Sequence, residues 1–299
     1  MDSLNSIKKE IKSTNDLLQN VSTMKILAAA NIKKYEKIVF NLQKYQSNVN
    51  LGLQAILKQH PHIVNYIKYT ENFYREENSG ESILVVIGSN QGLCGKFNDK
   101  IVNYFSENIK NENDSCIITV GDRINMLIAA KKLPINQHFS VPNSAKQINE
   151  LVYRIFEVIE NKISQDNLKK VLIFYTNYDA NNKSSLNLIR KKILPLETKY
   201  FEKLRDKQWP TNKIPYWRVE TKKIAADFLQ QYIFASISMS VASSMAAEQF
   251  SRLTTLQRSE ENINDKIDEL TKQYNQTRQT MITSDILDSV SSLKVVRGG

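Results

Sequence analysis

The fold is decided by residues 253–281, which read LTTLQRSEENINDKIDELTKQYNQTRQTM. Apolar residues recur here at alternating steps of three and four, and the same steps extend back to Ala225. Fourteen of the seventeen positions reached in this way are apolar, although apolar residues make up only 41% of the chain. A 3.5-residue repeat of this length predicts a long helix that pairs with another helix along a left-handed coiled-coil seam. The positions are Ala225, Phe228, Tyr232, Ala235, Met239, Ala242, Ala246, Gln249, Leu253, Leu256, Glu260, Ile263, Ile267, Leu270, Tyr274, Thr277 and Met281.

A second seam begins near the N-terminus, where thirteen of sixteen positions are apolar in the same register. Because the segment 61–215 separates the two seams and can reverse the chain, we predict that helices at residues 1–60 and 216–297 form an antiparallel coiled coil within one chain. The alternative is that each seam pairs with another copy in a homodimer. The positions are Leu4, Ile7, Ile11, Thr14, Leu18, Val21, Lys25, Ala28, Ile32, Tyr35, Val39, Leu42, Gln46, Val49, Leu53 and Ile56.

Helix-breaking residues are scarce and gathered in the middle of the chain. There are only 8 glycines and 6 prolines; residues 1–60 contain Gly52 alone, and residues 216–297 contain neither type. A β-sandwich or barrel needs many turn residues, so this distribution excludes both. The uncharged stretch 228–247 has the length of a membrane span, but seven of its residues are Ser or Gln. We therefore expect a helix that is buried on several sides rather than a membrane span.

The distribution of charge bears on the kind of partner, and the cysteine content bears on the cellular compartment. The net charge of +10 is dispersed among acidic residues, without a polybasic arm or interleaved aromatic residues. This pattern argues against nucleic acid as a partner. The two cysteines, Cys94 and Cys116, form neither a disulfide framework nor a metal-binding pattern, which indicates a reducing compartment.

The middle of the chain has a different pattern. Continuous β-branched runs, the first two followed by Gly88 and Gly121, are typical of buried parallel strands. Strands that alternate with helices predict a Rossmann-like α/β domain at residues 82–215 with a mostly parallel sheet. The sequence His60-Pro61-His62 indicates a helix stop, and residues 61–81 are expected to be a linker. The predicted elements are strands at 83–87, 116–120, 171–176 and 189–196 and helices at 98–109 and 144–163, the last capped by Ser144.

One glycine-rich segment invites comparison with a phosphate-binding loop. Residues 88–96 read GSNQGLCGK, but a Walker loop needs four residues between its glycines and then Gly-Lys-Ser or Gly-Lys-Thr. The segment is therefore read as a tight turn, with a nucleotide-binding enzyme as a second alternative. Cys94 would need a histidine partner to act as a nucleophile, and only His60, His62 and His138 exist. We predict no catalytic, cofactor-binding or metal-binding residue.

These features resemble the gamma subunit, the central stalk rotor, of rotary ATP synthases. The resemblance spans essentially the whole chain and is carried by three blocks. Residues 7–30 are similar to the opening helix of the family, residues 92–98 to its G-L-C-G-G-F-N turn, and residues 267–287 to its terminal helix. The chain departs from the family at Lys96, which stands in place of a second glycine, at Asn31, which replaces a usual lysine, and in its polar tail, residues 292–299.

The resemblance implies a rotor shaft without a catalytic site of its own and without a cofactor. Its partners would be a hexameric ring of alpha and beta subunits, which holds the catalytic sites, together with the epsilon subunit and the membrane c-ring. Membrane association would be indirect, on the cytoplasmic face of a bacterial inner membrane. Ion flow through the c-ring would turn the shaft and drive the beta subunits through their conformations.

The resemblance also implies residue roles. By motif match, Arg278 and Gln279 are expected to contact the catalytic ring. Met24 and Lys25, on the facing helix, are expected to contact it too, and Met24 is expected to lie near the same level along the coiled coil as Arg278 and Gln279. A cationic face, which consists of Lys25, Lys33, Lys34, Lys37 and Lys44, is expected to meet acidic surfaces of the ring; the alternative is that this face is only solvated. The α/β domain is expected to form the foot that meets epsilon and the c-ring through one turn. The turn residues are Gly92, Leu93, Cys94, Gly95, Phe97 and Asn98.

Overall fold

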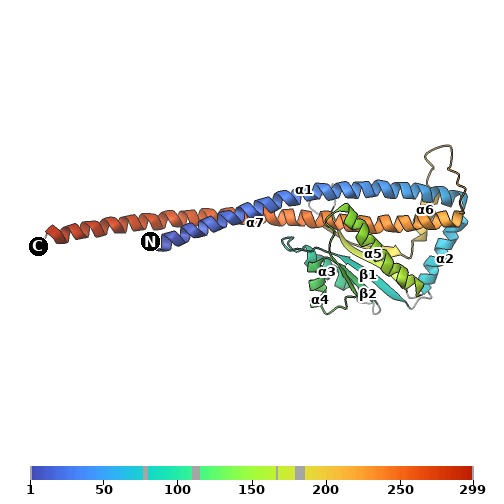
Figure 1. The fold of residues 1–299 in the computed structure, drawn as a ribbon, viewed down its shortest axis with the longest axis horizontal. Helices are drawn as coiled ribbons and strands as arrows, with labels where there is room; N and C mark the ends of the chain where they lie inside the picture. The colour runs from blue at the N-terminus through green and yellow to red at the C-terminus, as the bar shows by residue number, and fades with distance from the viewer. Residues whose placement is uncertain (1, 77–79, 110–114, 166–167, 179–185, 298–299) are drawn as a thin grey trace. The chain divides into compact units, whose positions relative to one another are not determined.

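A computed structural model describes residues 2–76, 80–109, 115–165, 168–178 and 186–297. The chain forms two compact units (Figure 1). The smaller unit, called here the shaft, consists of Met1–Ala29 and Arg252–Gly299. The larger unit, called the base, consists of Ala30–Ser251. Two long helices, α1 (Asp2–Gln59) and α7 (Thr221–Arg297), contribute to both.

In the shaft, burial follows the predicted heptad positions. Within residues 4–20 of α1, the five seam residues are half-buried and every other residue is exposed. Within residues 261–281 of α7, only the six seam positions are covered. The ion pair between Lys25 and Glu260, both on seam positions, joins the two helices. The predicted seam is therefore confirmed here residue by residue.

In the base, the same two helices run antiparallel. Asn31 lies within hydrogen-bond distance of Gln249, and Gln46 donates to Ser236 at 3.2 Å. The residue number of the partner on α7 therefore decreases as the residue number on α1 increases. Fifteen consecutive residues of α7, 235–249, are buried apart from the half-buried Met239. This confirms the expectation of a helix covered on several sides. No helix in the described part of the chain is long and apolar enough to cross a membrane.

The base also contains a five-stranded sheet in the order β3-β2-β1-β4-β5. Strands β1 (Glu81–Ile87), β2 (Ser115–Val120), β3 (Gln137–Phe139) and β4 (Leu168–Tyr178) are parallel, and β5 (Leu186–Leu194) pairs with β4 in the antiparallel direction. The sheet is thus mostly parallel, as predicted, and the expected fourth strand is its antiparallel edge.

Helices cover both faces of this sheet. Helices α3 (Phe97–Asn108) and α4 (Asp122–Ala130) pack on one face around Leu84, Val86 and Phe174. Helix α5 (Ala145–Ser164) and the buried part of α7 pack on the other face. Ser144 caps α5 as predicted, because its hydroxyl accepts a hydrogen bond from the Gln147 amide. The result is a three-layer α/β domain built onto the coiled coil.

Several elements differ from the sequence-based expectation. The segment 61–81, expected to be a linker, contains helix α2 (His62–Glu76), although α1 does end at Gln59, just before the predicted stop. Helix α6 (Thr198–Asp206) was also not predicted. The two helices pack with α1 and α7 in a separate apolar cluster that includes Ile63, Ile67 and Phe201. Helix α7 begins at Thr221, five residues later than expected.

Candidate functional site

The turn that follows β1 has a restricted backbone. Leu93 and Gly95 have positive φ angles of 59° and 56°. Glycine adopts this region without steric cost, whereas a leucine there is strained. A strained residue persists only where its surroundings hold the conformation. The Leu93 side chain itself is 57% exposed, so its neighbours in the turn supply that constraint.

The side chain of Asn98 closes the turn from inside. Its Oδ1 accepts a hydrogen bond from the Ser89 amide at 3.0 Å, and its Nδ2 donates to the Ser89 hydroxyl at 2.8 Å and to Cys94 Sγ at 3.4 Å. A Cβ on Gly88 would stand 2.7 Å from this Oδ1, so glycine is required for the approach. Because Asn98 is buried, its bonds satisfy an amide that would otherwise be costly to desolvate.

The turn is attached to helix α7. Cys94 and Phe97, each 2% exposed, pack against Ala247, and the Ser251 hydroxyl donates to the Cys94 carbonyl at 2.8 Å. Gly92 is exposed, and a Cβ there would meet nothing within 4 Å. The turn thus has a buried half that fixes it to α7 and an exposed half, Gly92 with Leu93.

The position of the turn bears on its expected role in the foot. Ala247, where the turn packs, lies nineteen residues along α7 from Phe228, which packs in the cluster with α2 and α6. At 1.5 Å per residue this is about 28 Å. The turn and the α2–α6 cluster therefore lie at two separate places on the base.

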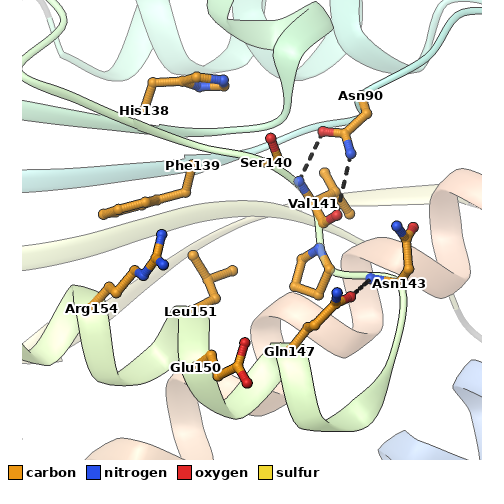
Figure 2. A pocket seen from close by; sticks show the side chains of 11 residues that line it. Asn90, His138, Phe139, Ser140, Val141, Asn143, Gln147, Glu150, Leu151 and Arg154 are labelled. Carbon is orange, nitrogen blue, oxygen red and sulfur yellow. Dashed lines mark hydrogen bonds between the residues drawn. The ribbon is translucent and has the colours of Figure 1, made fainter.

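A hollow of about 550 Å³ opens where β1 and β3 end, beside the first turns of α5 (Figure 2). Rossmann-like sheets bind their ligands at this edge. Here the amide of Asn90 binds both the N–H and the C=O of Val141, at 2.8 and 3.2 Å, and Gln147 accepts from the Asn143 amide at 2.7 Å. These two side chains brace the loop 140–143.

His138, Cys94 and Cys116 lie on separate segments of the base. His138 Nε2 pairs with Asp122 Oδ1 at 2.8 Å, and its Nδ1 lies 3.1 Å from the Thr119 hydroxyl. Cys94 contacts Ser89 and Asn98, and Cys116 is buried and free. In the described residues, no group of three or more His, Cys, Asp or Glu side chains is placed to hold a metal ion.

The residues expected to contact the catalytic ring all lie in the shaft. Met24 is 44% exposed, and Arg278 and Gln279 are also exposed. Lys25 is half-buried and occupied by its ion pair with Glu260. Since Arg278 lies eighteen residues beyond Glu260, about 27 Å along the helix, the expectation that Met24 and Arg278 share a level is wrong. They form two separate surfaces.

The expected cationic face is partly engaged within the chain. Lys34 donates to the Asn143 carbonyl at 2.9 Å, and the Lys44 ammonium sits 4.4 Å from the centre of the Phe40 ring. Lys33 and Lys37 are exposed. The face is therefore less free than the sequence suggests, because long side chains reach neighbours that the sequence does not reveal.

Sequence reasoning missed a set of buried ionisable groups in the base. Burial raises the pKa of Tyr175 and Tyr232 above the usual tyrosine value and lowers the pKa of Lys191. It also missed Ser251, which holds the turn although it lies 157 residues away in the sequence. Local pattern carries no signal for such contacts, since they depend on how the two helices are brought against the sheet.

The fold and these contacts define a class of protein: a Rossmann-like domain built into a long intramolecular coiled coil. A family model described as ATP synthase matches residues 3–296. The chain therefore belongs to the ATP synthase gamma family. It is 26% identical over 296 residues to the ATP synthase gamma chain of Clostridium kluyveri, covering 98% of each chain. It is 24% identical to that of Rickettsia typhi, covering 99% of this chain and all of the relative.

Solved structures share the fold. A chain of the Euglena gracilis mitochondrial ATP synthase, from a structure described as OSCP, F1 and c-ring, matches with a TM-score of 0.67 and 16% identity. That match covers all of this chain and 96% of the other. A chain from a structure described as the rotor of the same enzyme matches with a TM-score of 0.62 and 17% identity, covering 94% and 99%. Both likenesses confirm the predicted fold class.

Proposed function

We propose that the chain is the central rotor shaft of an ATP synthase. In this role it couples ion flow through a membrane c-ring to conformational change in the catalytic beta subunits, or runs in reverse as an ATP-driven ion pump. It carries no catalytic site, since ATP is made and hydrolysed on the surrounding ring. Family membership and the likeness to a chain from the rotor of the Euglena gracilis enzyme support this proposal.

The observation that carries the proposal is the tip of α7. Beyond Met281 every residue from 282 to 287 is exposed, including Ile282, Ile286 and Leu287 at 47%, 57% and 60%. Grouped exposed apolar side chains of this kind mark an interaction surface. A sleeve formed by the alpha and beta subunits would cover them. The exposed Arg278 and Gln279 lie just before this tip and would contact the catalytic subunits as it turns.

A rotor of this kind acts through differential affinity. At each angle, the shaft presents a different side to each beta subunit and so favours a different conformation. Each exposed polar contact is worth only about 0–1 kcal/mol. Such contacts therefore select among angles more than they hold the assembly together.

In the base, we propose that the surface around α2 and α6 meets the epsilon subunit and the c-ring. The segment between α6 and α7 supports this, since it exposes Ile214, Tyr216 and Val219 at 43%, 85% and 54%. Association with the membrane would be indirect, on the cytoplasmic face of a bacterial inner membrane. The exposed half of the 92–98 turn, separate from this surface, remains a candidate contact of its own.

The homodimeric tether, the alternative from sequence, would use the seams of α1 and α7 to bind a second copy. In the structure the seams of the two helices are occupied by each other. No observation in the described residues favours the tether over the rotor.

The proposal is tested in inverted membrane vesicles of a strain that carries only the variant gene. Arg278→Ala should reduce ATP-driven ion pumping relative to ATP hydrolysis while the complex still assembles. Lys272→Ala, an exposed substitution on the same helix, is the matched control. A deletion from residue 257 to the end should abolish coupled synthesis, and full coupled synthesis after that deletion would refute the rotor assignment.

A further inference from the structure

A second hollow, of about 220 Å³, lies between α5 and α7 in the base. It is distinct from the hollow at the carboxyl edge of the sheet, with which it shares no lining residue. Three aromatic rings, two carboxylates and two amides line it. They are Tyr153, Phe156, Phe234, Glu157, Glu160, Gln230 and Gln231.

The aromatic rings of the hollow pack against one another and stay partly open to solvent. The rings of Tyr153 and Phe234 have centroids 5.3 Å apart at 48°, and those of Phe156 and Phe234 are 6.3 Å apart at 32°. Tyr153 is nevertheless 66% exposed. An aromatic residue that packs against a neighbouring ring and is still open to solvent offers a contact surface at low entropic cost.

The charge of the hollow has a single sign. Glu157 and Glu160 are one helical turn apart on α5, both are exposed, and the described residues give neither carboxylate an ion-pair partner. The lining contains no lysine, arginine or histidine. Carboxylates at this spacing on one helix face repel each other. A cation placed between them would therefore be attracted by both.

The amide part is held in place. The Tyr45 hydroxyl of α1 donates to Gln231 Oε1, which orients that amide at the edge of the hollow. Helices α5 and α7 thus form the wall of the hollow, and α1 supports it through Tyr45. Preformed walls lower the entropic cost of binding.

We propose that this hollow receives an arginine side chain from a partner protein. A guanidinium stacks on aromatic faces and binds carboxylates through paired N–H donors, so it matches the rings and the two glutamates together. A phosphate or an acidic segment would be repelled by Glu157 and Glu160. The inference rests on the proposed function, since the partner would be another subunit of the same ATP synthase.

The first test is a photo-cross-link in the assembled complex. Tyr153 is replaced by p-benzoylphenylalanine, the ATP synthase is purified from membranes and irradiated, and the cross-linked peptide is identified by mass spectrometry. We expect a peptide of another subunit with an arginine within two residues of the cross-link. A peptide without arginine, a second copy of this chain, or no cross-link in a complex that assembles and hydrolyses ATP would overturn the inference.

The second test measures charge. The double variant with Glu157→Lys and Glu160→Lys is purified as a complex without cross-linking. The subunit that the cross-link identified should then dissociate from it about tenfold faster, equivalent to 1.4 kcal/mol. An arginine-to-glutamate change in that subunit should restore slow dissociation. The control is Glu107→Lys, an exposed change on α3, which packs on the other face of the sheet. Equal effects of Glu107→Lys and the double variant, or no effect of the double variant, would refute the site.

The two tests separate this inference from the proposed function. If the chain fails to purify with alpha and beta subunits, the rotor assignment fails. If it purifies with them and rotates, but position 153 cross-links to a peptide without arginine, only the arginine site fails.

Discussion

Helix α7 is packed in two different ways. At residues 235–249, in the base, it is covered on nearly all sides and is rich in serine and alanine. At residues 261–281, in the shaft, only the seam positions are covered, and the exposed face consists of charged residues together with Asn, Gln and Thr. The same helical conformation is thus stabilised by close packing of small residues in one unit and by a narrow apolar stripe in the other.

The difference is visible in how serine is used. In the base, Ser240 donates to the Ser236 carbonyl within the helix, and Ser244 reaches the Ile87 carbonyl of β1 at 3.5 Å. Small side chains let the helix approach the sheet closely, although the buried Ser238 hydroxyl has no hydrogen-bond partner in the described residues. In the shaft, the exposed hydroxyl of Thr271 bonds back to Ile267 within the helix. The base segment of α7 is thus held by contacts on several sides, whereas the shaft segment is held along its seam.

The largest expected effect comes from breaking the packing of the base. Phe97→Ala removes a ring that is 2% exposed and packs against Ala247, and it should lower the free energy of unfolding by about 3–5 kcal/mol. Ile282→Ala, at a 47% exposed position of the shaft, is the control and should change stability by less than about 0.5 kcal/mol. Urea unfolding of the purified chain measures both. Equal costs would contradict the contrast between the units.

The next effect is a pH dependence confined to the base. Burial, and then repulsion by Tyr200, raises the pKa of Tyr232 well above its usual value. A tyrosine whose pKa is higher in the folded state than in the unfolded state contributes its full stabilisation below the pKa of the unfolded state, near 10. This contribution to the free energy of unfolding is lost as the pH rises. Each such tyrosine makes the free energy of unfolding fall more steeply at alkaline pH, by about 1.4 kcal/mol per pH unit.

Replacing Tyr232 by Phe should therefore flatten that loss by about 1.4 kcal/mol per pH unit above about pH 10. The measurement is urea unfolding at a series of pH values between about 9 and 12. Tyr216→Phe, at an 85% exposed position, is the control. An identical slope for the Tyr232 variant and the unsubstituted chain would show that this hydroxyl is not desolvated.

The smallest expected effect is that of the ion pair in the shaft. Lys25 and Glu260 retain 28% and 22% side-chain exposure, so a double-mutant cycle with alanine should give a coupling of about 0–1 kcal/mol that falls with added salt. The cycle is measured by urea unfolding at low and high salt. A coupling above about 2 kcal/mol would mean that the pair, more than the apolar seam, holds the shaft together.

The sequence predicted elements where a pattern repeats or stands out locally. The heptad positions and the strands β1, β2 and β4 follow from periodicity and from long apolar runs. Strand β3 has only the residues Gln137–Phe139, none of them buried, and leaves no such run. Helices α2 and α6 carry an amphipathic pattern of their own, with Ile63, Ile67 and Phe201 on the apolar face, which the prediction of a linker at residues 61–81 overlooked.

The candidate site was predicted in part for the same reason. The turn residues 92–98 were visible in the sequence, but their attachment to Ala247 and Ser251 joins segments about 150 residues apart. The prediction that Met24 and Arg278 lie at the same level was wrong, because the register of an antiparallel helix pair depends on where the chain reverses. The seam pattern alone repeats too regularly to fix that register.

The most direct test of the rotor account is an ATP-driven rotation measurement. Lys146, whose side chain is 87% exposed in the base, is replaced by cysteine and labelled with a bead; Cys94 and Cys116 are buried, so labelling is selective. The complex of this chain with its own alpha and beta subunits is then fixed through the ring and supplied with ATP. The account predicts continuous rotation of the bead in one direction. Sustained ATP hydrolysis with a stationary bead would contradict it.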